Sequence, residues 1–235
     1  MNWRGDWWYW LRYRLLWRIV FNQSGYKLSS SQTGEDMVAL SLLNGVHRGF
    51  YVDIGAYHPV GLSNTYHFYL RGWRGLVVDA NPQTQRQFKL VRPRDTSVLA
   101  CVDVAEGVEK DYHLFDQPAL NTITPAGVQR GVEVHGAKLL STVRMKTRTL
   151  NGLLAEHVPA GQEVHLLSVD VEGLDYDLLK SVDFTRHRPW VVCFEDHEFV
   201  SGGLVETSSV QLLKQAGYVV AGVTPLSVIM KRADL

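Results

Sequence analysis

Five runs of apolar residues, each followed by an acidic residue, dominate the pattern of hydrophobic and polar positions along the chain. The acids that close the runs are Asp53, Asp79, Asp103, Asp170 and Glu195. Valine- and leucine-rich runs of this length are typical of strands buried on both faces, which occur in parallel sheets covered by helices. The segments between the runs leave room for a helix between consecutive strands. The pattern therefore predicts an α/β domain built on a parallel sheet.

The remaining periodicity supplies the helices and the end of the sheet. We expect helices at about 33–46, 61–72, 82–92, 149–157, 174–182 and 206–216, and strands at 50–53, 75–79, 97–103, 164–170 and 190–195. Two final apolar runs, 218–223 and 226–231, are separated only by a short Thr-Pro segment, which is typical of an antiparallel hairpin. An irregular insert is expected at roughly 106–163. We predict one domain, residues 31–235, after an N-terminal appendage, residues 1–30.

The acids at the strand ends predict a polar ligand cleft. In open α/β sheets the ligand lies outside the carboxyl ends of the strands, where the strand order reverses. Asp79 is expected to accept hydrogen bonds from two ribose hydroxyls, and Asp103 from an adenine amine. A cap on the helix that begins at Asn81-Pro82 is the structural alternative for Asp79.

The turn after the first strand argues against a dinucleotide. Its sequence, residues 53–61, is DIGAYHPVG, which lacks the G-x-G-x-x-G arrangement that lets a pyrophosphate approach a helix N-terminus. A cationic ligand without phosphate, carrying an amine and a sulfonium, suits this chemistry better. Asn64 and Thr65 are placed to meet the amino-acid end of such a ligand.

Composition excludes other classes of protein. Lys+Arg and Asp+Glu both number 24, which gives no net charge and no basic field for a nucleic-acid partner. A hydrophobic content of 46% excludes disorder for the bulk of the chain. Cys101 and Cys193 lie inside apolar runs, which favours reduced thiols and a cytoplasmic location.

The first twenty-odd residues differ from the rest of the chain. From Trp7 to Phe21 they are largely apolar and aromatic, interrupted by Arg12, Arg14 and Arg18. A membrane span needs roughly 20 apolar residues, so residues 1–21 are not expected to cross a bilayer. Tryptophan beside arginine favours a helix at the inner membrane surface. Packing on the domain or on a second copy in a homo-oligomer is an equal alternative, because the apolar residues spread nearly all round the helix, and a disordered tail is the third.

Six short motifs in order then resemble one family. They are Ser31-Gln32-Thr33-Gly34-Glu35-Asp36, Asp53-Ile54-Gly55-Ala56, Ser63-Asn64-Thr65, Gly72-Trp73-Arg74-Gly75, Asp79-Ala80-Asn81-Pro82 and Val169-Asp170-Val171-Glu172-Gly173. Across roughly residues 31–232 the chain resembles the FkbM-type S-adenosylmethionine-dependent methyltransferases. The resemblance implies a class I methyltransferase (Rossmann-like) fold: a seven-stranded mixed sheet, a terminal antiparallel hairpin and helices on both faces. It also implies methyl transfer to a hydroxyl, of a sugar in a bacterial glycan or glycan precursor, or of a secondary metabolite.

Residues and resemblance together define the expected donor site. We expect S-adenosylmethionine to contact Gln32, Asp53, Gly55, Ala56, Tyr57, Asn64, Thr65, Asp79, Ala80, Asn81, Asp103 and Val104. The insert, around 120–143, is expected to form part of the acceptor pocket or its lid, because long excursions in compact domains are usually functional.

Two arrangements are open for the chemistry. In one, Asp170, Glu195 and His197 bind Mg²⁺ or Mn²⁺, which acidifies the acceptor hydroxyl. In the other, His197 is the general base without a metal, oriented by Asp170 or Glu172. A structural role for the same acids as caps and ion pairs is the third alternative.

Two other functions compete with methyl transfer as interpretations of the sequence. A nicotinamide-dependent oxidoreductase would need the dinucleotide fingerprint, which is missing. A catalytically silent relative that binds the nucleoside or acts as a scaffold is opposed by the retention of every acid at a strand end.

Overall fold

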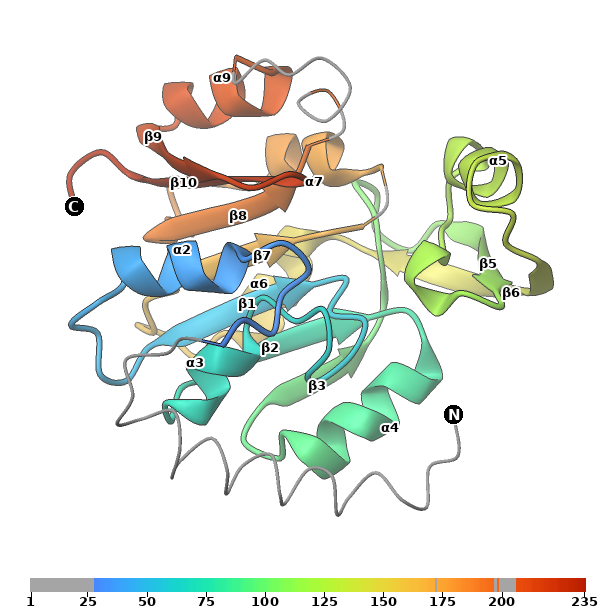
Figure 1. Ribbon diagram of the computed structural model, residues 1–235, viewed down its shortest axis with the longest axis horizontal. Helices are drawn as coiled ribbons and strands as arrows, with labels where there is room; N and C mark the ends of the chain where they lie inside the picture. Colours follow the sequence, from blue (N-terminus) through green and yellow to red (C-terminus); the bar gives the residue numbers. More distant parts are fainter. Residues whose placement is uncertain (1–27, 172, 197, 199–205) are drawn as a thin grey trace.

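The computed structural model describes residues 28–171, 173–196, 198 and 206–235, and a seven-stranded sheet forms its centre (Figure 1). The strands are β1 Phe50–Ile54, β2 Arg74–Asp79, β3 Thr96–Leu99, β7 Leu166–Val169, β8 Val191–Glu195, β9 Tyr218–Val223 and β10 Ser227–Arg232. Their spatial order is β3-β2-β1-β7-β8-β10-β9, and within this sheet β10 alone runs in the opposite direction to the other strands. The mixed sheet and its terminal hairpin confirm the predicted class I methyltransferase type of fold.

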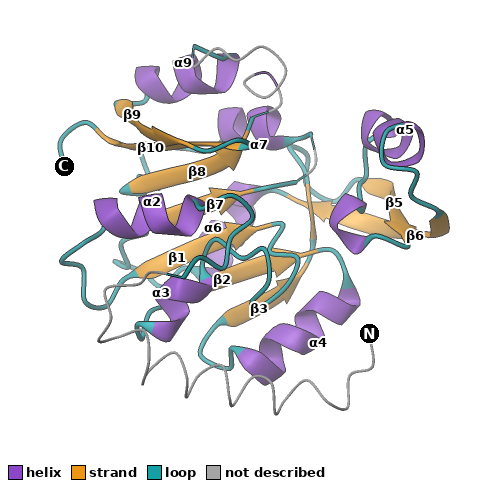
Figure 2. Cartoon of the chain, viewed as in Figure 1, coloured by secondary structure: helices purple, strands orange, loops and turns teal. Residues whose placement is uncertain are grey.

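Helices cover both faces of this sheet (Figure 2). They are α2 Glu35–Leu42, α3 Tyr66–Leu70, α4 Pro82–Val91, α6 Leu150–His157, α7 Asp175–Ser181 and α9 Ser208–Gln215. Side chains alternate along each strand, so Tyr51 of β1 packs with α2, α3 and α4, whereas Val52 and Ile54 pack with α6, α7 and α9. Burial on both faces explains why these strands are continuous apolar runs in the sequence.

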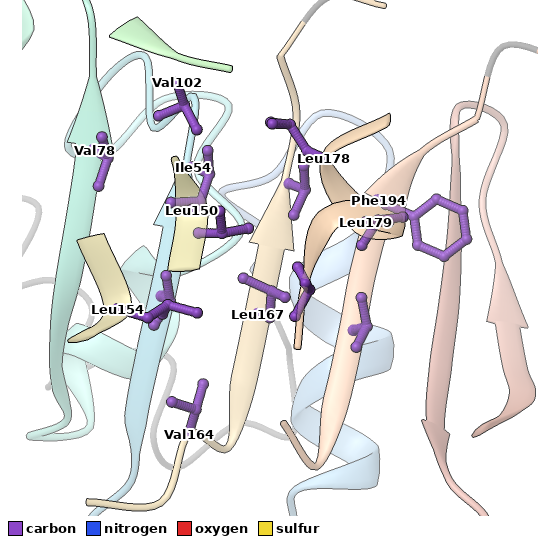
Figure 3. Packing of buried hydrophobic residues seen from close by; sticks show 14 of the residues in the cluster. Ile54, Val78, Val102, Leu150, Leu154, Val164, Leu167, Leu178, Leu179 and Phe194 are labelled. Atoms are coloured by element: carbon purple, nitrogen blue, oxygen red, sulfur yellow. The ribbon is translucent and has the colours of Figure 1, made fainter. Parts of the chain in front are cut away.

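The core under α6 and α7 fixes the strand ends. Figure 3 shows Leu154 of α6 and Leu178 of α7 beside Ile54 and Leu167 on the sheet. Each of these side chains is at most 2% exposed, and full burial of one such side chain stabilises the fold by about 1.5–3 kcal/mol. The residues that follow these strands are therefore held on a rigid base.

The insert has regular structure, which corrects the irregular segment expected there. It contains β5 Glu109–Phe115, the short 3₁₀ helix η2 Pro118–Leu120, α5 Pro125–Glu133 and β6 Leu139–Arg148. β5 and β6 form an antiparallel ribbon, and β6 also pairs with β4, Cys101–Val102. This second sheet lies on the side toward which the parallel strands point (Figure 1).

The predicted strand 97–103 is divided between the two sheets. β3 pairs with β2, and the Ala100 N–H donates to the Asp79 carbonyl before the chain leaves the central sheet. The next two residues, in β4, pair with β6. An apolar run alone carries no signal for this change of partner, because both halves are apolar.

The predicted helix 61–72 is shorter than expected, because α3 begins only at Tyr66. The preceding segment, residues 57–65, is a loop in which Tyr57 and Leu62 have φ of 49° and 56°. A residue in this left-handed region cannot belong to a right-handed helix.

The start of the described chain packs on the domain. Residues 28–30 belong to the predicted appendage, yet Ser30 donates through its N–H and its hydroxyl to Asp36, and its carbonyl accepts from the Ser63 N–H. Residues 1–27, with the predicted interfacial or packing helix, lie outside the described residues. Of the helices that the structure describes, none is both long and apolar enough to span a bilayer.

Candidate active site

A cavity of about 120 Å³ opens where β1, β2 and β7 end, and we name it the larger cavity. Most of its lining comes from the ends of the parallel strands, the loop 57–65 and the insert. The lining residues are Gln32, Gly55, Tyr57, Leu62, Val78, Asp79, Ala80, Ala100, Cys101, Val102, Tyr112, Pro118, Ala119, Asn121, Thr122, Ile123, Asp170, Val171 and Leu174.

Asp79, an acid of the larger cavity, has a defined orientation. Its Oδ2 accepts the Tyr57 N–H at 2.8 Å, and its Oδ1 accepts the Asn81 N–H at 2.6 Å. Burial raises the pKa of Asp79 to about 6, although these two backbone donors lower it. The cap of α4 is made by Asn81, whose side chain accepts the Gln83 N–H at 3.0 Å.

Gly55 allows the ends of β1 and β7 to approach each other closely. Its φ is 77°, and a Cβ on this residue would lie 1.7 Å from the Asp170 carbonyl oxygen. No side chain fits in that space, which explains a glycine here without any phosphate to accommodate. The close approach places Asp170 beside the turn that follows β1.

A second, smaller cavity of about 20 Å³ adjoins the first and shares Gln32, Leu62 and Asp170 with it. Its remaining lining is Glu35, Asn64, Glu195, Leu226 and Ser227.

Hydrogen bonds fix two polar side chains of the smaller cavity. Asn64 donates from Nδ2 to the Ser168 hydroxyl at 3.1 Å. Glu35 accepts the Thr33 N–H at 2.9 Å and the Thr224 hydroxyl at 2.8 Å. Burial raises the pKa of Glu35, but these hydrogen bonds outweigh it and hold the pKa below its ordinary value, so this carboxylate is ionised near neutral pH.

The two cavities gather part of the predicted donor site. Gln32, Gly55, Tyr57, Asp79 and Ala80 line the larger cavity, and Asn64 lines the smaller one. The other predicted residues do not line either cavity; they are Asp53, Ala56, Thr65, Asn81, Asp103 and Val104.

Two of these residues have other partners. Asp53 accepts the Thr65 hydroxyl at 2.5 Å, and Asp103 Oδ2 lies 2.6 Å from Lys110 Nζ. The expected contact between Asp103 and an adenine amine stays a prediction. Its neighbours in the sequence, Cys101 and Val102, contribute to the cavity wall instead.

The predicted catalytic and metal-binding residues are placed only in part. Asp170 and Glu195 line the smaller cavity together, whereas Glu172 and His197 lie outside the described residues. Within the described part of the chain, no group of three or more His, Cys, Asp or Glu is arranged to hold a metal ion. The His197 base and the ion bound by Asp170, Glu195 and His197 therefore stay predictions.

A further acid, Asp175, shapes the segment that carries Asp170. Its carboxylate accepts the N–H groups of Val171 and Gly173 at 3.2 and 3.3 Å. Burial, together with the nearby Asp170 charge, raises the pKa of Asp175 well above its ordinary value. These hydrogen bonds connect Val171, the residue after Asp170, and Gly173 to the first residue of α7.

The insert supplies a wall of the larger cavity that residue patterns did not identify. Tyr112, Asn121 and Ile123 line the same cavity as Asp79, although the insert was expected around the acceptor. Burial raises the pKa of Tyr112, so this phenol is neutral. The only signal in the sequence was the length of the insert, which predicts a function without assigning residues.

The lining of the larger cavity fits a nucleoside without phosphates. Asp79 offers carboxylate oxygens to hydroxyl donors, and Ala100, Val102 and Ile123 offer apolar surface to a flat base. Among its described lining residues there is no lysine or arginine, the side chains that usually neutralise phosphate. Asp79 would hold the ribose of S-adenosylmethionine, and Asp170 would face its cationic end.

Comparison with known proteins identifies the family of the chain. The model of the methyltransferase FkbM domain matches residues 53–220. No curated protein matches the chain. Among solved structures, a TehB-like SAM-dependent methyltransferase from Corynebacterium glutamicum is similar, with 10% identity, a TM-score of 0.41, and coverage of 95% of this chain and 98% of that one.

An O-methyltransferase from Bacillus cereus in complex with SAH is also similar, with 10% identity, a TM-score of 0.38, and coverage of 94% of this chain and 89% of that one. The domain match spans well over half of the sequence and includes the strand ends that form the larger cavity. The chain belongs to the FkbM family of S-adenosylmethionine-dependent methyltransferases.

Proposed function

We propose that this methyltransferase transfers its methyl group to a hydroxyl of a carbohydrate, in a bacterial glycan or glycan precursor. The observation that carries the proposal is the polar lining of the smaller cavity, which combines Glu35, Asn64, Asp170 and Glu195 next to the larger cavity. Carboxylates and amides are the side chains that hydrogen-bond hydroxyl groups. A sugar presents such groups at neighbouring positions, and it therefore suits this lining.

The proposed reaction needs alignment and removal of one proton. S-adenosylmethionine, when bound, supplies a methyl group that is attached to a sulfonium. The leaving group is the sulfur, which becomes a neutral thioether. The chain holds the acceptor oxygen in line with that carbon, which contributes on the order of 7–11 kcal/mol to a barrier of this kind. As the C–O bond forms and the C–S bond breaks, Asp170 accepts the hydroxyl proton. The predicted His197 base, oriented by Asp170 or Glu172, is the alternative proton acceptor.

An acceptor panel tests the proposal. The purified full chain is incubated with donor labelled in its methyl group and with neutral methyl glycosides, their deoxy analogues, amines, carboxylic acids and phenols. We expect label on the neutral glycosides that survives strong alkali, because a methyl ether resists hydrolysis and a methyl ester does not. Label confined to amines, carboxylates or phenolic metabolites contradicts a sugar acceptor, and donor binding without any transfer favours a silent relative.

Donor affinity is expected to rise with pH through the pKa of Asp79. The ionised carboxylate accepts ribose hydroxyls better than the protonated one, so S-adenosylhomocysteine should bind about tenfold more tightly at pH 7 than at pH 5. Calorimetric titration at the two values measures this. In the free protein, stability depends on pH with the opposite sign. Because burial raises the folded-state pKa of Asp79 above its ordinary value of 3.8, the contribution of this carboxyl to stability falls as the pH rises from about 4 to about 6.

The control for this pH dependence is Asp79→Asn, whose side chain does not titrate. The variant should bind S-adenosylhomocysteine weakly and equally at both pH values. An unchanged slope in the variant would assign the titration to another group.

A further inference from the structure

Arg92, the residue that follows α4, is only 1% exposed, although arginine is rarely buried to this extent. Its guanidinium donates five hydrogen bonds, which uses every N–H that the group carries. A buried cation with a full set of fixed partners defines the positions of those partners strongly.

One group of partners neutralises the charge. Arg92 Nε lies 2.7 Å from Asp95 Oδ2, and both side chains are fully buried. Tyr51 of β1 accepts from Arg92 Nη2 at 2.8 Å and donates to Asp95 Oδ1 at 2.6 Å. The Gly75 N–H at the start of β2 also donates to Asp95 Oδ1, at 3.0 Å. The guanidinium is thereby fixed to the central sheet.

The other partners belong to the loop 57–65. Arg92 Nη1 donates to the Pro59 carbonyl at 3.4 Å and to the Ser63 hydroxyl at 3.2 Å, so it holds the loop on both sides of Leu62. Arg92 Nη2 donates to the Thr65 hydroxyl at 3.0 Å, and that hydroxyl in turn donates to Asp53 on β1. The loop is therefore connected to the sheet at three points through one side chain.

This loop needs such support because its backbone is strained. Tyr57 and Leu62 are non-glycine residues with φ of 49° and 56°, a left-handed conformation that side chains disfavour. Such residues keep this conformation only where the surrounding structure determines it, and they concentrate at functional sites. Both line the larger cavity, and Leu62 also lines the smaller one.

We propose that Arg92 is a positioning residue for the methyl donor: its guanidinium holds the strained loop 57–65 so that Tyr57 and Leu62 form one wall of the larger cavity. This rests on the assignment of that cavity to the donor and is independent of the acceptor. Arg92 itself contacts neither cavity; it acts through Pro59, Ser63 and Thr65.

Donor affinity in variants tests this role without any acceptor. Arg92→Lys keeps a cation beside Asp95 but cannot donate five hydrogen bonds, and Thr65→Val removes one loop hydroxyl while it leaves the Arg92–Asp95 pair intact. Thr65→Ser restores the hydroxyl. Tyr218→Phe is the matched control, because it deletes a buried hydrogen bond, from Tyr218 to the Pro189 carbonyl at 2.7 Å, at a remote edge of the sheet.

Calorimetry with S-adenosylhomocysteine, below the unfolding midpoint of each variant, gives the readout. We expect Arg92→Lys and Thr65→Val each to weaken binding about tenfold. This is the loss in affinity that corresponds to one charge-assisted hydrogen bond, here a bond that positions the loop 57–65. Thr65→Ser and Tyr218→Phe should bind within about twofold of the wild type. The Tyr218 variant nevertheless unfolds at a lower temperature, which separates stability from positioning.

Three results would overturn the proposal. The first is wild-type affinity for S-adenosylhomocysteine in both Arg92→Lys and Thr65→Val. The second is a loss of affinity in Thr65→Ser equal to that in Thr65→Val. The third is a loss of affinity in Tyr218→Phe equal to that in Arg92→Lys and Thr65→Val. If the wild-type chain itself binds no S-adenosylhomocysteine, the donor assignment of the larger cavity fails first, and the positioning role fails with it.

Discussion

Asp79→Asn is expected to weaken binding of S-adenosylhomocysteine about a hundredfold, because hydrogen bonds to a charged group contribute about 1.5–3 kcal/mol each and the ribose offers two hydroxyls. Asparagine keeps a carbonyl oxygen for a backbone N–H, of Tyr57 or of Asn81, so the turn after β2 should survive. Isothermal titration calorimetry near neutral pH measures the change.

The matched control for this variant is Asp183→Asn. Like Asp79, Asp183 accepts hydrogen bonds from two backbone N–H groups, those of Thr185 and Arg186. It lies on the surface before β8, outside both cavities. This control should bind as the wild type does. An Asp79→Asn affinity within about threefold of the wild type would remove Asp79 from the donor site, since two charged hydrogen bonds predict far more.

Asp170→Asn is expected to lower the rate of methyl transfer at saturating donor about a hundredfold or more. The reason is that Asp170 lines both cavities, and a positioned proton acceptor contributes about 10²–10⁴ in rate. Single-turnover measurements with a saturating donor and a sugar acceptor from the panel separate the transfer rate from donor binding.

Asp177→Asn is the control for charge removal on the same segment, because Asp177 is exposed on α7. It should leave the transfer rate unchanged. If Asp170→Asn turns over as fast as the wild type while His197→Ala does not, Asp170 is excluded as the proton acceptor and the predicted His197 base is favoured.

The central sheet was predictable from the sequence because its strands are buried on both faces. Side chains such as Tyr51 and Val52 point to opposite faces, yet both are fully buried, so the run reads as continuously apolar. The β5–β6 ribbon gives no such signal. Leu139, Leu140 and Val143 of β6 are exposed, and the strand carries no alternation of buried and exposed positions that a pattern could detect.

The candidate site was predictable only where it lies at strand ends. Asp79 is the last residue of β2 and Asp170 directly follows β7, and the topology brings both to the larger cavity. Tyr112 and Ile123 reach the same cavity from the insert, which is a long-range contact that no local spacing encodes. Arg92 was missed because an arginine after a helix, next to Pro93, is typical of a solvent-exposed end; only the packed structure shows its burial.

The most direct measurement is a crystal structure of the full chain grown with S-adenosylhomocysteine. We expect electron density for the nucleoside in the larger cavity, with the ribose hydroxyls on the Asp79 carboxylate, the base against Val102 and Ile123, and the sulfur end toward Asp170. Density for the nucleoside anywhere else, or contact of the ribose with a different side chain, would contradict it.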